Sequence, residues 1–304
     1  MLFGGKMSTA HKRWNAKNVG IVEIKRHENI SMVFQGMVPA LYKECRGLQV
    51  GTAFHAVQKT SGLETKQKME YRALAADLLS KATHELEKGM HGMYISKTQG
   101  DKEYIWVTAA VGILHCITGD KKKAAEHLRL IKANASKDES GQFTLVPGDT
   151  SKNSISHIWV SLLAAAIGDL ETAKQQGFSA AKNKRDASGL YISDSGNSPQ
   201  THMNALIGLA YFQKGEKEAA RELLSAIENK MPKCKNGIHT PSISISPDYG
   251  TLAEAVAPLA MLKTLVLGPD KAEEYCNKVA LLHGNERSSV LVGIMYALLS
   301  GEIL

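Results

Sequence analysis

The feature that most constrains the fold is an internal repeat of about 48 residues. One series of glycines recurs with gaps of 49, 48, 48 and 47 residues: Gly92, Gly141, Gly189, Gly237 and Gly284. A second series follows the first four members after 27, 27, 26 and 31 residues: Gly119, Gly168, Gly215 and Gly268. Two interleaved series with matching gaps indicate one structural unit repeated along the chain.

Each unit predicts a helical hairpin that turns at the second glycine. An alanine-rich apolar segment precedes this glycine, as in 104–118, 154–167 and 199–214. A segment with lysine and glutamate on one face follows it, as in 121–134, 170–184 and 216–230. Glycine closes a helix by taking the left-handed conformation, and an acidic residue just beyond it favours the start of the next helix. Ser198 and Pro199 predict a helix start, with serine as the cap.

The two helices of a unit differ in how much of their surface is apolar. The first is apolar nearly all round, which is typical of a helix buried on more than one side, whereas the second is amphipathic. We therefore expect an inner and an outer layer of helices, with a terminal half unit after Gly284. The fold class is all-α: a superhelix or incomplete α/α toroid of about five hairpins over residues 63–304. An open superhelix or incomplete ring is the favoured form, because a complete six-hairpin ring needs more chain.

Residues 1–62 form a separate basic segment, in which we expect a short strand near 19–25 and a helix near 30–45. Residues 1–72 hold twelve lysines and arginines against five acidic residues, whereas the remaining 232 residues hold 25 of each sign. Such a segment is either a solvated surface or an attraction site for a polyanion.

Other classes of protein are disfavoured by what the sequence lacks. The apolar runs 104–119 and 253–268 are too short, or too interrupted, to span a bilayer. The first residues contain no apolar run of the kind found in signal peptides, so we expect no secretory signal. The four cysteines are isolated, which argues against a zinc site or a disulfide framework and favours reduced thiols in the cytoplasm. No phosphate-binding or dinucleotide motif occurs, so we expect no cofactor. No His-x-x-x-His or His-Glu-x-x-His pattern occurs, so we expect no metal.

The third unit resembles a tetratricopeptide repeat. The residues that match this family's spacing are Ile207, Gly208, Tyr211, Gly215, Ala220, Leu224, Ile227 and Pro232. That family repeats every 34 residues, whereas each unit here carries about 14 more, placed in the loop before the first helix. The resemblance implies a scaffold that binds a protein or peptide partner on its concave face.

A weaker resemblance is to α/α toroids, which include several sugar-processing enzymes. Residues 189–211 look similar to one toroid unit, in which a long loop presents side chains above an inner helix. This resemblance implies an enzyme that acts on a carbohydrate or a similar polar substrate.

Acidic residues and histidines supply the candidates for chemistry. Asp149 and Asp194 lie in the long loops, and His157 and His202 lie near the starts of inner helices. Converging carboxylates and imidazoles serve as general acids and bases. Helix capping and turn formation are the alternatives for the aspartates, above all for Asp101 and Asp248, which directly precede helices. For the histidines, the alternative is a hydrogen bond to a neighbouring loop.

Alignment on the hairpin glycine places Trp106, Ile155 and His202 at one equivalent position of the inner helices. Together with Phe212 in the same groove and Tyr191 in the preceding loop, Trp106 and His202 form the predicted binding surface. The groove is otherwise apolar, and we expect it to be filled either by an apolar peptide or by residues 1–62. Its other expected lining residues are Ala109, Ile113, Ile158, Leu162 and Leu209.

Two hypotheses of function follow. The first is a non-enzymatic scaffold that binds a protein or a small polar ligand, since no recognisable catalytic set occurs. The second is a toroid enzyme that uses Asp149, Asp194, His157 and His202 on a carbohydrate or similar substrate.

Overall fold

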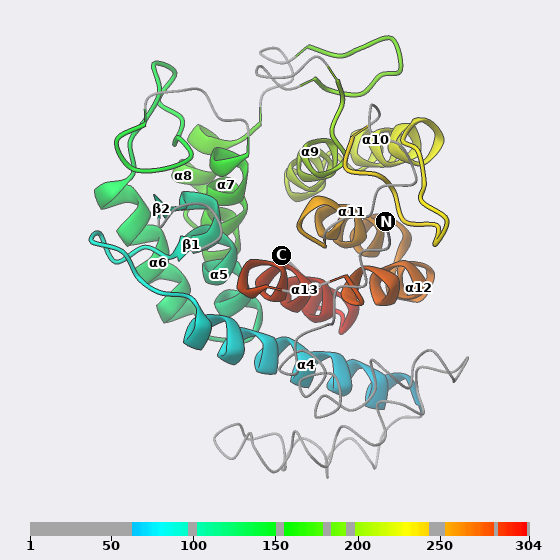
Figure 1. Cartoon of the computed structure of the whole chain (residues 1–304), viewed down its shortest axis with the longest axis horizontal. Helices are drawn as coiled ribbons and strands as arrows, with labels where there is room; N and C mark the ends of the chain where they lie inside the picture. The colour runs from blue at the N-terminus through cyan, green and yellow to red at the C-terminus, as the bar shows by residue number, and fades with distance from the viewer. Residues whose placement is uncertain are drawn as a thin grey trace, which may run out of the picture. The chain divides into compact units, whose positions relative to one another are not determined.

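The computed structural model describes residues 63–96, 102–149, 155–178, 184–192, 198–242, 253–282 and 285–302 (Figure 1). The regular elements of the described chain are helices, apart from two strands of two residues each. These are β1 (Ile95–Ser96) and β2 (Lys102–Glu103), which pair antiparallel. The all-α prediction is confirmed. The helices are α4 (Leu63–Glu85), α5 (Ile105–Ile117), α6 (Lys121–Asn134), α7 (Ser156–Ile167), α8 (Leu170–Gln176), α9 (Thr201–Gln213), α10 (Lys217–Lys230), α11 (Ala253–Leu267), α12 (Pro269–Ala280) and α13 (Glu286–Leu299).

The chain divides into two compact units, Met1–Ala73 and Leu74–Leu304. Of the first unit, the structure describes the N-terminal part of α4, so the strand and helix expected within residues 1–62 lie outside the described residues. The second unit holds the complete series of helical hairpins. The predicted boundary after residue 62 stays a prediction.

The hairpin turns form as the glycine pattern predicts. Gly119, Gly168 and Gly215 have φ values of 99°, 88° and 81°, which side chains with a Cβ rarely adopt. Asp120 and Asp169 then cap the following helices, since their carboxylates accept hydrogen bonds from Lys123 N and Thr172 N, both at 3.1 Å.

Within the second unit, the inner helices contact one another in a closed cycle. Helix α5 contacts α7, α7 contacts α9, α9 contacts α11, and α11 contacts α13. Helix α13 then contacts α5, so the described part of the chain completes the cycle with five inner helices (Figure 1). The outer helices α6, α8, α10 and α12 each pack against the inner helix that precedes them. This is the arrangement of an α/α toroid, and it closes with five inner helices.

Glycines let the inner helices approach closely. A Cβ added at Gly112 would lie 2.9 Å from Leu163 Cδ2 of α7, and one added at Gly208 would lie 2.5 Å from Leu262 Cδ2 of α11. At Gly293 of α13, the same atom would lie 2.8 Å from Leu114 Cδ2 of α5. Leucine methyl groups therefore fill the space that a side chain would need at these positions.

Burial follows the predicted division into layers. The inner helices are buried over most of their length, whereas α6 buries only Ala124, His127, Leu128 and Ile131. The apolar residues expected to line an open groove are fully or almost fully buried: Ala109, Ile113, Ile158, Leu162 and Leu209. Closure of the cycle explains this burial.

Two local predictions are wrong. Helix α8 ends at Gln176 rather than near 184, because Gly177 takes an extended conformation and the Gln176 side chain bonds to the preceding loop. Ser198 does not cap α9, which begins at Thr201. Its hydroxyl instead lies 3.1 Å from the Ser242 hydroxyl.

The described helices include none that is both long enough and apolar enough to cross a membrane.

Candidate functional site

The loops before the first four inner helices, α5, α7, α9 and α11, begin with the same tight turn. The turn pairs a residue with another six positions later, and a glycine with φ between 79° and 83° lies between them. The four pairs are Lys88 with Tyr94, Lys137 with Phe143, Arg185 with Tyr191, and Lys233 with His239. In the first three, the cation lies 4.5 to 5.8 Å from the centre of the aromatic ring. The repeat therefore extends into the loops.

A carboxylate satisfies the backbone of the first three of these turns. In the second loop, Asp138 Oδ1 accepts hydrogen bonds from Ser140 N at 2.8 Å and Gln142 N at 3.0 Å. In the third loop, Asp186 Oδ1 accepts from Ser188 N at 2.9 Å and Leu190 N at 3.1 Å. Partial burial raises the pKa of Asp138, but the hydrogen bonds outweigh this effect and hold it below its usual value.

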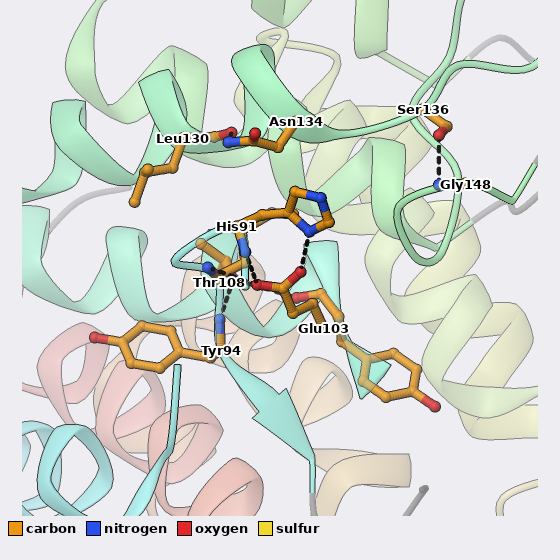
Figure 2. A network of polar contacts seen from close by, with 10 residues as sticks. His91, Tyr94, Glu103, Thr108, Leu130, Asn134, Ser136 and Gly148 are labelled. Carbon is orange, nitrogen blue, oxygen red and sulfur yellow. Dashed lines mark hydrogen bonds and ion pairs between the residues drawn. The ribbon is translucent and has the colours of Figure 1, made fainter. Parts of the chain in front are cut away.

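The first loop meets the same requirement with different residues. Its position equivalent to Asp138 is Gly89, and the carboxylate comes from Glu103 of β2, which accepts from His91 N at 2.9 Å and Met93 N at 3.2 Å. His91 Nδ1 also lies 2.5 Å from Glu103 Oε2. Figure 2 shows the two contacts of His91 with Glu103, one through its backbone nitrogen and one through its ring. A Cβ at Gly89 would lie 2.3 Å from Glu103 Cγ. Glycine at 89 thus makes room for the substitute carboxylate.

We predict that the two carboxylate positions are interchangeable. Glu103→Ala leaves the two amide donors of His91 and Met93 without an acceptor and lowers the free energy of unfolding by about 2 kcal/mol. Adding Gly89→Asp to this variant restores half of the loss or more, because the new carboxylate occupies the place of Asp138 in the second loop. Chemical denaturation measures both effects.

The single variant Gly89→Asp is the control. It should destabilise the protein, because the aspartate then competes with Glu103 for the same space. A double variant that is less stable than Glu103→Ala would contradict this interpretation of the loop.

Polar groups from the helices fix the aromatic residue of each turn. Thr108 Oγ1 accepts from Tyr94 N at 3.1 Å, and Asn204 Oδ1 accepts from Tyr191 N at 2.7 Å. His157 stands at the position of α7 that is equivalent to Thr108 and Asn204, eleven residues before the hairpin glycine. Its Nδ1 lies 2.8 Å from the Gln176 carbonyl oxygen, and Gln176 Oε1 accepts from Phe143 N at 2.8 Å. His157 is buried and connects α7 to α8, which places it in the framework of the second loop.

Four side chains gather at the N-terminal ends of the inner helices, and we call them the rim cluster: Trp106, Trp159, Glu254 and Arg287. They come from α5, α7, α11 and α13. An Arg287 guanidinium nitrogen lies 3.1 Å from Glu254 Oε1, and its carbon lies 6.0 Å from the centre of the Trp106 ring. The Trp106 and Trp159 rings are 6.5 Å apart. The rim cluster is therefore continuous across four inner helices.

The rim cluster contains one buried donor that the described residues do not satisfy. The Arg287 side chain is 7% exposed, and its Nε atom has no hydrogen-bond partner in the described part of the chain. Glu254 Oε1 is already shared, because Asn285 Nδ2 donates to it at 2.8 Å. Glu254 and Trp106 both remain partly exposed. A buried arginine donor beside an accessible indole is suited to a ligand that carries hydrogen-bond acceptors.

His202 lies in the first turn of α9, at the position equivalent to Trp106. Burial lowers the pKa of His202 to about 4, so the imidazole is neutral at pH 7. Among the described residues its ring makes no hydrogen bond. It is therefore the residue of α9 that corresponds to the rim cluster, and a neutral imidazole both donates and accepts hydrogen bonds.

The remaining sequence candidates do not gather at one place. Asp149 lies partly exposed in the second loop. Phe212 lies in the last turn of α9, at the opposite end of that helix from His202, with Lys217 Nζ 5.7 Å from the centre of its ring. Tyr191 is 1% exposed, and its hydroxyl contacts Arg185 at 2.7 Å and the Tyr211 hydroxyl at 2.6 Å. The loop aspartates at 101, 194 and 248 lie outside the described residues.

The described residues contain no group of three or more histidine, cysteine, aspartate or glutamate side chains placed to hold a metal ion.

The sequence pattern pointed to Trp106 and His202 but missed three members of the rim cluster. Trp159 falls at a different register of its helix from Trp106, and Glu254 and Arg287 belong to units whose loops depart from the repeat. One signal was available: a tryptophan, an acid and an arginine occupy the first turns of helices that otherwise carry apolar residues.

Comparisons with known proteins add little. No protein-family model matches the chain, and no curated protein matches it. Among solved structures, the chain is similar to a family 76 glycoside hydrolase from a bovine Bacteroides thetaiotaomicron strain, with a TM-score of 0.45 and 12% sequence identity. The match covers 70% of this chain and 55% of the hydrolase, so this chain spans little more than half of that protein. A likeness of this degree assigns no function.

Proposed function

We propose that this protein binds a saccharide, or a similar hydroxyl-rich ligand, at the rim cluster. The observation that carries the proposal is the Nε of buried Arg287, which has no hydrogen-bond partner in the described part of the chain and lies next to the partly exposed ring of Trp106. Sugars present an apolar C–H face that packs on an indole and hydroxyl oxygens that accept from a guanidinium. Ligand sites commonly combine aromatic surface with a few oriented polar groups.

Charge at the rim cluster favours a neutral ligand. Arg287 and Glu254 form an ion pair and cancel one another, and His202 is neutral at pH 7. An anionic ligand would therefore meet no uncompensated positive charge among these side chains. A neutral oligosaccharide fits this balance. The contacts of Glu254 with other described residues are made by Oε1, so Oε2 is the oxygen that would accept from a sugar hydroxyl.

The test is an array of neutral and acidic oligosaccharides probed with the whole chain, followed by calorimetric titration of each sugar that binds. We expect a neutral sugar to bind and its affinity to fall at least about tenfold in Trp106→Ala and in Arg287→Lys. Lysine keeps the charge of arginine but removes the Nε donor. The control is Lys278→Ala on the exposed side of α12, which should bind as the wild type does.

Failure of every oligosaccharide to bind the wild-type chain would refute the proposal. So would unchanged affinity in both rim-cluster variants, provided that they melt at the same temperature as the Lys278→Ala control.

Hydrolysis of the bound saccharide is the second candidate, and the fixed carboxylate of Glu254 favours it. Glycoside hydrolysis normally uses two carboxyl groups, one as a general acid and the other as a base or nucleophile. The rim cluster supplies one. The second would come from a loop aspartate, either Asp149 or one at position 101, 194 or 248.

If the protein is such an enzyme, Glu254→Gln should bind the sugar but form product at least about a hundredfold more slowly. Mass spectrometry of the sugar after incubation measures this rate. Absence of product with the wild-type chain would exclude hydrolysis of that sugar and leave the binding function intact.

A further inference from the structure

A pair of stacked histidines lies between the first inner helix and its outer partner. His115 belongs to α5 and His127 to α6, and their rings are 5.4 Å apart with an angle of 22° between the planes. The Tyr94 ring lies 5.5 Å from His127 on a further side. The two histidines are 7% and 6% exposed. The two imidazoles are thus stacked in the contact between α5 and α6, where they are almost fully buried from solvent.

The surroundings of this pair suit neutral rings. His127 Nδ1 is buried and has no hydrogen-bond partner among the described residues, so a proton added there would find no acceptor. Burial lowers the pKa of His127 to about 4, and the neighbouring His115 adds to the effect. Burial is also the main cause of the lowered pKa of His115.

The charged groups around the pair do not compensate a proton. Lys88, in the loop after α4, and Lys123, on α6, oppose protonation of both rings. Asp120 in the hairpin turn favours protonation but is already paired with Lys123 at 3.3 Å. Glu126 on α6 favours protonation of His115. Helix α7 contributes no charge at this contact, where Leu163 packs against Gly112 beside His127.

The other hairpins carry no ionisable imidazole at these places. The residues equivalent to His127, eight positions after the hairpin glycine, are Gln176, Leu223 and Cys276. The residues equivalent to His115, four positions before that glycine, are Ala164, Tyr211 and Thr264. Acid sensitivity of this kind is therefore confined to one repeat.

We propose that the stacked histidines make the α5–α6 contact an acid-responsive switch, in which uptake of a proton releases α6 from α5. The buried face of α6 includes Ala124, Leu128 and Ile131. Release exposes this apolar face and leaves the remaining hairpins packed.

The direction follows from where the proton binds more tightly. An exposed histidine binds a proton near pH 6.5, whereas His127 in the closed contact binds one near pH 4. The released form therefore holds more protons in this interval, and the closed contact weakens as the pH falls from 6.5 towards 4. Between pH 7 and pH 5, His127 alone raises the equilibrium constant for release roughly 20-fold.

The test is hydrogen–deuterium exchange of the whole chain at pH 7 and pH 5, corrected for the intrinsic pH dependence of exchange. We expect protection in α6 to fall roughly 20-fold at pH 5 relative to α10, the outer helix with Leu223 at the equivalent position. His127→Leu places that leucine in α6 and should remove most of the difference, leaving only the part that His115 contributes. His84→Gln, at an exposed histidine of α4, should leave it unchanged.

An NMR titration of His127 in the wild-type chain keeps the proposal testable if the leucine variant does not fold. Titration of His127 near pH 6.5, equal protection of α6 at both pH values, or a pH response of undiminished size in His127→Leu would each overturn the proposal.

Discussion

The inner helices can form a closed cycle because glycines stand where helices meet leucines of their neighbours. Gly112 faces Leu163, Gly208 faces Leu262, and Gly293 faces Leu114. Each contact removes apolar surface from water and brings two helix backbones closer than larger residues would permit. The last contact joins α13 to α5 and completes the cycle. The rim cluster depends on it, because Arg287 reaches Trp106 only if the last inner helix lies beside the first.

The loops show how a repeat keeps its geometry while its residues change. Each turn must supply acceptors for backbone amides that face the protein interior. The second and third turns use an aspartate of their own. The first turn uses Glu103, and Gly89 leaves room for the Glu103 side chain because it has no Cβ. His157 and Asn204 have a similar role at the helix ends, where they bond to neighbouring backbone or side-chain groups. Such framework roles account for several polar residues that a sequence reader would otherwise assign to chemistry.

Much of the fold could be predicted from the sequence, since glycine spacing and helix amphipathicity are local signals. They located the hairpins and their turns, and the buried inner and exposed outer helices followed from the contrast between 104–118 and 121–134. Closure of the cycle could not be predicted, because Leu114 and Gly293 are far apart in the sequence and no motif links them, although they lie next to one another in the structure. The short α8 was missed because the bonds of the Gln176 side chain to the second loop are tertiary contacts.

The candidate site was predicted only in part. Alignment of the repeats identifies Trp106 and His202 as equivalent. Glu254 and Arg287 belong to the rim cluster because α11 and α13 bring their side chains together, which no local pattern in the sequence predicts. The sequence presents His157 as a candidate for chemistry because of its residue type, and the structure places its Nδ1 2.8 Å from the Gln176 carbonyl oxygen. The predictions for Asp101, Asp194 and Asp248 stay predictions.

A double-mutant cycle that combines one substitution in α5 with one in α13 tests most directly whether the inner helices form a closed ring. Leu114→Ala leaves a cavity, and Gly293→Ala places a methyl group against Leu114. In a closed array the added methyl fills part of the cavity, so the double variant should be more stable than the sum of the single effects by at least about 1 kcal/mol. Effects that add to within about 0.5 kcal/mol would show that the two residues do not touch, and would contradict closure.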